Sequence, residues 1–142
     1  MRIIAVGIGG AGCRIVDRLY STDRKSSKVA CVQGLAIDVD EESMKLLTGL
    51  PENARMCFSA LEPGLFGLPG DDGKASAPID INEIVSRIQN LESGENDAIF
   101  LCCGLGGGMA DVAPHIIAGL RSSVVEPIFG LITLPCLAEG EK

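Results

Sequence analysis

The sequence predicts an α/β fold built on a doubly wound parallel sheet of about five strands, with helices on both faces. Five short apolar runs alternate along the chain with segments of helical periodicity. No hairpin dipeptide joins any two of these runs, so each strand needs a crossover to reach a parallel neighbour. The length of 142 residues suits a single domain, residues 1–142.

The apolar runs are the expected strands, and most of them are continuous, as in strands buried on both faces. Strands are predicted at residues 2–6, 33–37, 55–58, 98–103 and 128–134.

The first predicted helix follows the glycines of residues 7–12. Ile15, Val16 and Leu19 return there at a spacing that places them on one helical face. A short second helix is expected after the acidic residues 38–42, because acids suit a helix start.

The second half of the chain adds a long loop and two further helices. Residues 59–78 contain four glycines and three prolines. Loops of this length are usually functional or disordered, so this loop is a candidate site. Asp80 and Glu83 resemble a capping box at the start of a helix that runs to residue 91. The last helix is expected over roughly residues 111–121.

Charge and hydropathy exclude several classes of protein. The chain has 19 acidic and 12 basic side chains, a formal net charge of −7, and an acidic surface repels a phosphate polymer, so nucleic-acid binding is not expected. The longest weakly polar run, residues 98–110, falls short of the ~18 residues of a membrane span. The N-terminus has no pattern of a signal peptide. We therefore expect a cytoplasmic protein without a membrane span.

The six cysteines and the single histidine form no metal-binding pattern. No two cysteines have Cys-x-x-Cys spacing, and most lie in apolar runs. We expect buried thiols in a reducing compartment, without a zinc site.

Glycine-rich segments follow two of the predicted strands. They are Gly7-Ile8-Gly9-Gly10-Ala11-Gly12 and Gly104-Leu105-Gly106-Gly107-Gly108. Such a loop before a helix binds phosphate, because glycine lets the backbone approach closely and the first helical amides point at the anion. In a doubly wound sheet both loops would flank the crevice at the carboxyl edge, where they could face one ligand.

One hypothesis is a Rossmann-like NAD(P)-binding oxidoreductase domain. Gly7, Gly9 and Gly12 fit the dinucleotide fingerprint, and Asp38 stands at a strand end where such proteins hold a ribose. The sequence offers no evident catalytic group for hydride transfer, since His115 is its only histidine.

The two glycine loops also resemble the nucleotide loops of the tubulin/FtsZ superfamily. Residues 4–12 look like its first loop, and residues 104–108 followed by Ala113-Pro114 look like its phosphate loop. Further strands and loops of the family are similar, in the same order, to residues 35–38, 64–73 and 126–140. Within it, the sequence looks most like the archaeal CetZ group.

This resemblance implies a cytoskeletal module that binds GTP or GDP. Carried over to this sequence, it assigns nucleotide binding to Gly9, Gly10, Ala11, Gly12, Cys13, Asp38, Gly70, Gly104, Gly106, Gly107, Gly108, Met109, Ala110, Asp111 and Glu139.

The second loop departs from the family pattern. Where the family has Thr-Gly-Ser/Thr-Gly, this sequence has Met109-Ala110-Asp111-Val112, so the hydroxyls are gone. Asp111 is either the N-cap of the last helix or a carboxylate that repels a phosphate there. Because it competes with a phosphate in both cases, we expect weak or degenerate nucleotide binding.

Acidic pairs follow the second and third predicted strands. Asp38 and Asp40 resemble the acid-x-acid pattern of tubulin and could hold Mg²⁺ beside phosphates, or they are solvated acids of a helix start. Asp71 and Asp72 either lie near the terminal phosphate or form a solvent turn.

The resemblance also implies segments after residue 142, namely those that recognise guanine and activate water in a neighbouring subunit. We expect the first part of a longer protein or a truncated relative, which acts through assembly rather than stand-alone hydrolysis. Without those segments residues 128–134 would be left uncovered, which favours self-association with copies or homologous subunits.

Overall fold

The computed structural model describes residues 1–26, 28–58, 79–91, 95–105 and 108–134. Gly70, Gly106, Gly107 and Glu139, together with the acidic pair Asp71 and Asp72, lie outside the described residues.

The predicted α/β fold is confirmed. One sheet contains β1 (Ile3–Ile8), β2 (Val32–Asp38), β3 (Arg55–Cys57), β4 (Ala98–Gly104) and β5 (Ile128–Thr133). Its strand order is β3-β2-β1-β4-β5, and every pair is parallel. The order reverses between β1 and β4, so the crevice typical of doubly wound sheets lies at the carboxyl ends of these two strands.

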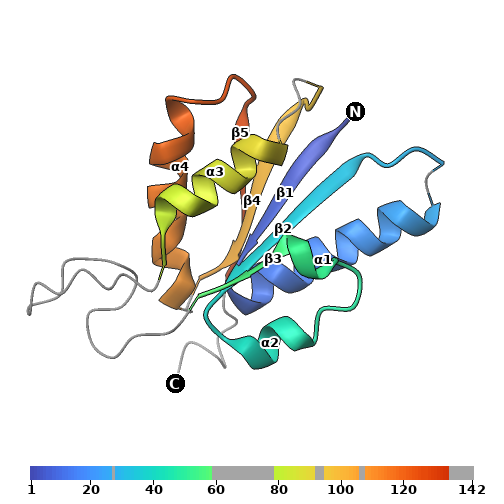
Figure 1. Cartoon of the computed structure of the whole chain (residues 1–142), viewed down its shortest axis with the longest axis horizontal. Coiled ribbons are helices and arrows are strands. Elements are labelled where there is room, and N and C mark those ends of the chain that lie inside the picture. Colours follow the sequence, from blue (N-terminus) through green and yellow to red (C-terminus); the bar gives the residue numbers. More distant parts are fainter. Residues whose placement is uncertain (27, 59–78, 92–94, 106–107, 135–142) are drawn as a thin grey trace, which may run out of the picture.

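Helices cover both faces of the sheet (Figure 1). On one face lie α1 (Gly9–Ser26) and α2 (Glu41–Lys45), and on the other lie α3 (Ile81–Leu91) and α4 (Ala113–Arg121). Short 3₁₀ turns, η1 (Glu52–Ala54) and η2 (Gly108–Val112), precede β3 and α4.

The core therefore has two apolar layers, one on each side of the sheet. Side chains of β1 alternate between them: Ala5 packs with Val16 beneath α1, whereas Val6 packs with Ile84 and Ile116 beneath α3 and α4. Burial on both faces explains why the strands are continuous apolar runs.

Carboxylates fix two of the connections. Asp17 of α1 accepts hydrogen bonds from the backbone N–H groups of residues 48–50 at 2.8 to 3.2 Å, which holds the segment between α2 and β3. Asp80 accepts from the N–H of Glu83 at 3.1 Å, as the predicted cap of α3 requires.

Two surface features complete the fold. Phe129, Leu131 and Ile132 of the edge strand β5 are each about half exposed, as predicted for this part of the chain. The prediction of buried thiols is wrong for Cys57, which is exposed at the end of β3, and for Cys31, which is half-buried.

No helix in the described part of the chain is both long and apolar enough to cross a bilayer.

Candidate functional site

The candidate site is the crevice where α1 begins beside β4. Residue Ile8 ends β1 and Gly9 already starts α1, so the first glycine segment is a direct strand-to-helix turn. The φ of Gly9 is +77°, a conformation that side-chain-bearing residues rarely adopt. The first N–H groups of a helix have no partner within that helix, and those of α1 lie directly after the carboxyl end of β1, beside the crevice.

The two glycine segments pack directly on each other. A Cβ on Gly12 would lie 2.0 Å from the carbonyl oxygen of Cys102 in β4. A Cβ on Gly104 would lie 2.9 Å from Thr133 Oγ1 and 3.0 Å from the Cβ of Ala11. The structure thus brings the described glycines of both segments together, as expected from the doubly wound topology.

Gly10 is the open position of this turn. A Cβ there would meet only Ser43 Oγ of α2, at the ordinary contact distance of 3.7 Å. The backbone around Gly10 is therefore where a ligand can approach α1 without displacing protein atoms. No sequence pattern marks Ser43 or Thr133, because only the tertiary fold places them beside glycines distant in sequence.

Asp40 is the N-cap of α2. Its Oδ1 accepts from the N–H of Glu42 and its Oδ2 accepts from the hydroxyl of Ser43, both at 3.0 Å. Both carboxylate oxygens are thus occupied, which agrees with the helix-start interpretation of this acid.

Asp38 lies at the carboxyl end of β2, next to β1, and is only 4% exposed. Its Oδ1 accepts from the N–H of Val39 at 2.7 Å. Among the residues that the structure describes, no three His, Cys, Asp or Glu side chains converge on a metal position. A magnesium ion held by Asp38 and Asp40 would therefore depend on ligands from water or phosphate.

Cys13 lies beneath the first turn of α1 rather than in the crevice. Its thiol donates to the carbonyls of Gly7 and Ile37, with the sulfur 3.5 and 3.4 Å from these oxygens. Burial, and secondly the Asp38 carboxylate, raise the pKa of this thiol to about 12. A thiol of this kind is inert, so Cys13 can contribute to a ligand only through its backbone.

The segment after β4 differs from the prediction. Residues 108–112 form the 3₁₀ turn η2, and α4 starts at Ala113, with Val112 as a cap residue that makes no side-chain hydrogen bond. The prediction that Asp111 caps this helix is therefore wrong. Pro114 fixes the start of α4, because its ring suits the first turn, where no N–H partner is needed.

The 3₁₀ geometry also explains the exposure of Asp111. Residues three apart are eclipsed in such a turn, and Met109 and Val112 both point into the core, at 7% and 1% exposure. Asp111 is left on the outer side, where it is exposed, while Ala110 is half-buried. The Met109 side chain also covers one side of the turn, since a Cβ on Gly9 would lie 3.0 Å from the Cβ of Met109.

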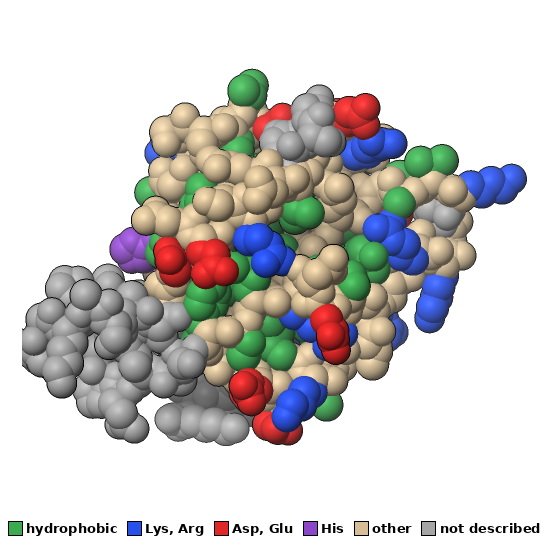
Figure 2. All heavy atoms as spheres, viewed as in Figure 1, with side chains coloured by type: hydrophobic (Ala, Val, Ile, Leu, Met, Phe, Trp, Pro, Cys, Tyr) green, Lys and Arg blue, Asp and Glu red, His purple; other side chains and the backbone are tan. Residues whose placement is uncertain are grey.

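The side chains near the crevice are mainly acidic. Asp38 ends β2, and Asp40, Glu41 and Glu42 follow it, with Lys45 at the end of α2. The basic residues Arg24 and Lys25 lie in the last turn of α1, at the far end of that helix. Figure 2 shows blue side chains gathered at the right of the view, where α1 ends. An anion at the crevice would thus gain from the α1 dipole, whereas the carboxylates after β2 would oppose it.

Comparison with known proteins identifies relatives over nearly the whole chain. The sequence is 30% identical to the tubulin-like protein CetZ3 and 32% identical to CetZ4, both of Haloferax volcanii, with 99% of this chain aligned. It is 29% identical to the cell division protein FtsZ 1 of Pyrococcus woesei over 98% of this chain. The chain spans 37%, 36% and 35% of the length of these three relatives. No protein-family model matches the sequence.

Solved structures show the same fold. The GDP-bound monomer of CetZ1 from Haloferax volcanii superposes with a TM-score of 0.78 at 26% identity, over 99% of this chain and 43% of CetZ1. The GTPγS-bound protofilament of CetZ2 from the same organism gives a TM-score of 0.72 at 21% identity, over 93% of this chain and 39% of CetZ2. By sequence and by fold, the chain is similar to the corresponding part of proteins of the tubulin/FtsZ superfamily, with CetZ proteins among its most similar relatives.

Proposed function

We propose that this chain is the phosphate-binding part of a guanine-nucleotide-dependent, self-assembling cytoskeletal module. The observation that carries the proposal is the contact of two glycine-bearing strand ends at the switch point, with Gly12 against β4 and Gly104 against Ala11. This arrangement presents the free amides of α1 at a crevice edge, where phosphate binds. The relatives support the nucleotide class, because CetZ1 was solved with GDP and CetZ2 with GTPγS.

Some features of the described residues favour a bound phosphate, and others disfavour it. The open backbone at Gly10 admits an anion, and the α1 dipole favours it. Met109 covers Gly9, and no hydroxyl follows Gly108 in η2. We therefore expect weak binding, with Gly9, Gly10, Ala11 and Gly12 as the main contacts. The resemblance to the family adds Gly70, Gly106, Gly107 and Glu139, which lie outside the described residues.

Assembly rather than catalysis is the activity that we expect of this chain. Among the residues that the structure describes, the single histidine, His115, is exposed on α4 rather than at the crevice. CetZ2 was solved as a protofilament, and the uncovered β5 supplies apolar surface for self-association.

An NAD(P)-binding oxidoreductase domain is the second candidate. The position of Asp38 at the end of β2, beside the start of α1, is the arrangement in which a carboxylate holds a ribose. The carboxylate is buried and turned to the N–H of Val39, however, which favours the first proposal.

Calorimetric titration with GTP, GDP, ATP and NAD, each with and without Mg²⁺, distinguishes the guanine-nucleotide-binding module from the NAD(P)-binding domain. We expect GTP and GDP to bind more tightly than ATP and NAD, and Mg²⁺ to lower the dissociation constant of GTP. Preferential binding of NAD would overturn the proposal.

A further inference from the structure

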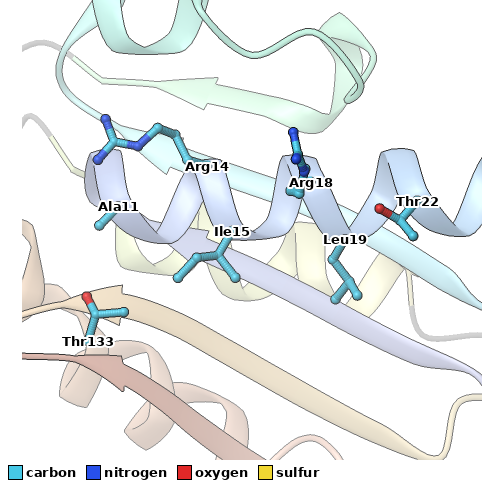
Figure 3. Close-up of a pocket in the computed structure, with 7 residues that line it drawn as sticks. All are labelled: Ala11, Arg14, Ile15, Arg18, Leu19, Thr22 and Thr133. Carbon is cyan, nitrogen blue, oxygen red and sulfur yellow. The ribbon is translucent and has the colours of Figure 1, made fainter.

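Successive residues in the first turn of α1 face different neighbours. Ala11 points toward the strands, where Thr133 of β5 lies opposite it (Figure 3). Gly10 instead faces α2, because the one atom of the described residues within 4 Å of a Cβ there is Ser43 Oγ, at 3.7 Å. Ser43 therefore supplies the side chain that a ligand meets when it approaches α1 beside Gly10.

The hydroxyl of Ser43 presents lone pairs rather than a proton to the crevice. Its Oγ lies 3.0 Å from Oδ2 of Asp40, and because an ionised carboxylate can only accept, Ser43 is the donor of this hydrogen bond. A serine hydroxyl has one proton and two lone pairs, so a further hydrogen bond to Ser43 must come from a donor. Ser43 is half-buried, which leaves part of its surface accessible to such a donor.

An acceptor at this position favours a neutral hydroxyl group over a phosphate oxygen. A phosphate oxygen only accepts, and the carboxylate of Asp40 beside Ser43 would repel its charge. A hydroxyl group can donate its proton to Ser43 Oγ, and a chain of hydrogen bonds that ends on a carboxylate polarises and strengthens this contact. The dipole of α1 has the opposite preference, for an anion. The crevice thus has an anion-binding side at α1 and a hydroxyl-binding side at α2.

Two side chains outside α2 fix the position of Ser43. Arg55 of β3 donates to three backbone carbonyl oxygens between residues 44 and 50, at 2.6 to 3.2 Å. Asp17 of α1 accepts from the N–H groups of residues 48–50. These contacts tie α2 and the residues after it to both α1 and β3. The hydroxyl is therefore in place before a ligand binds, which lowers the entropic cost of binding.

We propose that Ser43 is a specificity-determining residue whose Oγ accepts a hydrogen bond from a ribose hydroxyl of the bound nucleotide. A ribonucleotide carries both of the groups that this crevice favours, namely charged phosphates and neutral sugar hydroxyls. Asp38, at the end of β2, is not available for this role, since it is 4% exposed and accepts from the N–H of Val39. The inference rests on the proposed function and adds the part of the nucleotide that α2 recognises.

The test compares GTP with analogues that lack one ribose hydroxyl, in calorimetric titrations of the full chain. The analogues 2′-deoxyGTP and 3′-deoxyGTP each lack one hydroxyl, and their fluoro counterparts carry at that carbon an atom that cannot donate a proton. Loss of one neutral hydrogen bond corresponds to roughly fivefold in affinity. We expect the wild type to bind one of the two deoxy analogues, and the fluoro counterpart of that analogue, weaker than GTP by this factor.

The variant Ser43→Ala should lose this preference. It should bind GTP roughly fivefold more weakly than the wild type does, and it should bind GTP and the deoxy analogues equally. A merely structural effect of the substitution would weaken GTP and its analogues by the same factor and leave the preference intact. The matched control is Ser26→Ala, because the Ser26 hydroxyl also donates within a helix, to the carbonyl of Thr22, but lies at the far end of α1. This control should keep the wild-type preference, and circular dichroism confirms that each variant is folded.

Three results would overturn the inference while GTP still binds. They are equal binding of GTP and both deoxy analogues by the wild type, a fluoro counterpart of the weaker analogue that binds as tightly as GTP, and a preference that persists in Ser43→Ala. If the wild type binds GTP no better than ATP or NAD, the proposed function fails and the inference fails with it. The comparison among nucleotides thus tests the proposed function, whereas the ratio of affinities for GTP and its deoxy analogue tests Ser43.

Discussion

Gly12 of α1 faces the carbonyl oxygen of Cys102 in β4 so closely that a Cβ on Gly12 would lie 2.0 Å from it. The neighbouring atom is backbone in the middle of the sheet, so it cannot move aside as a flexible side chain can. This contact holds the first turn of α1 against β4 and thereby sets the spacing of the two glycine segments.

Replacement of Gly12 by alanine should therefore lower the free energy of unfolding by about 3 kcal/mol or more, beyond the usual range for overpacking between side chains. Urea denaturation followed by circular dichroism measures the change. Gly130→Ala in β5 is the matched control, because a Cβ there has nothing within 4 Å, and its effect should stay below about 1 kcal/mol. A Gly12→Ala protein as stable as the control would show that α1 does not pack on β4 in this way.

The buried thiol of Cys13 should make the fold sensitive to alkali. Burial raises its pKa from 9.0 to about 12, so between these values the folded chain keeps a proton that the unfolded chain releases. The free energy of unfolding must then fall as the pH rises through this window, by up to ~1.4 kcal/mol per pH unit for this group. Urea titrations at several pH values above 9 should give a shallower decline for Cys13→Ala than for the wild type. Equal slopes for the two proteins would contradict the burial of Cys13.

Replacement of Asp111 should tighten nucleotide binding. Its carboxylate follows Gly108 in η2 and cannot donate to a phosphate oxygen. Because the side chain is exposed, solvent screens the repulsion, so we expect a gain of roughly tenfold in GTP affinity for Asp111→Ser. Asp111→Asn removes the negative charge without adding a hydroxyl, and it should give most of the gain in GTP affinity that we expect for Asp111→Ser. If neither variant binds GTP more tightly, Asp111 points away from the nucleotide.

The sequence was sufficient for the architecture because the strong signals are local. Continuous apolar runs located all five strands, and the spacing of Ile15, Val16 and Leu19 located α1. The acids after β2 predicted the start of α2, and the cap residue Asp80 predicted the start of α3. Such signals are local because a cap residue bonds to backbone N–H groups two or three residues away.

The sequence-based prediction failed where tertiary packing determines the local conformation. The burial of Met109 and Val112 makes residues 108–112 a 3₁₀ turn, so the helix start moved from Asp111 to Ala113. Ser43 and Thr133 reach the glycine turn only through the fold, and no local pattern marks them.

Gly10 offers the most direct test of the central claim that the first turn of α1 receives the nucleotide phosphate. The crevice has room for a methyl group there, and alanine favours a helix over glycine, so Gly10→Ala should be folded and at least as stable as the wild type. The added methyl would nevertheless stand where the anion must approach the amides of α1. Calorimetric titration of GTP with Mg²⁺ should therefore show weaker binding by Gly10→Ala, with Gly130→Ala unchanged. GTP affinity that is the same in Gly10→Ala and in the wild type would contradict the claim.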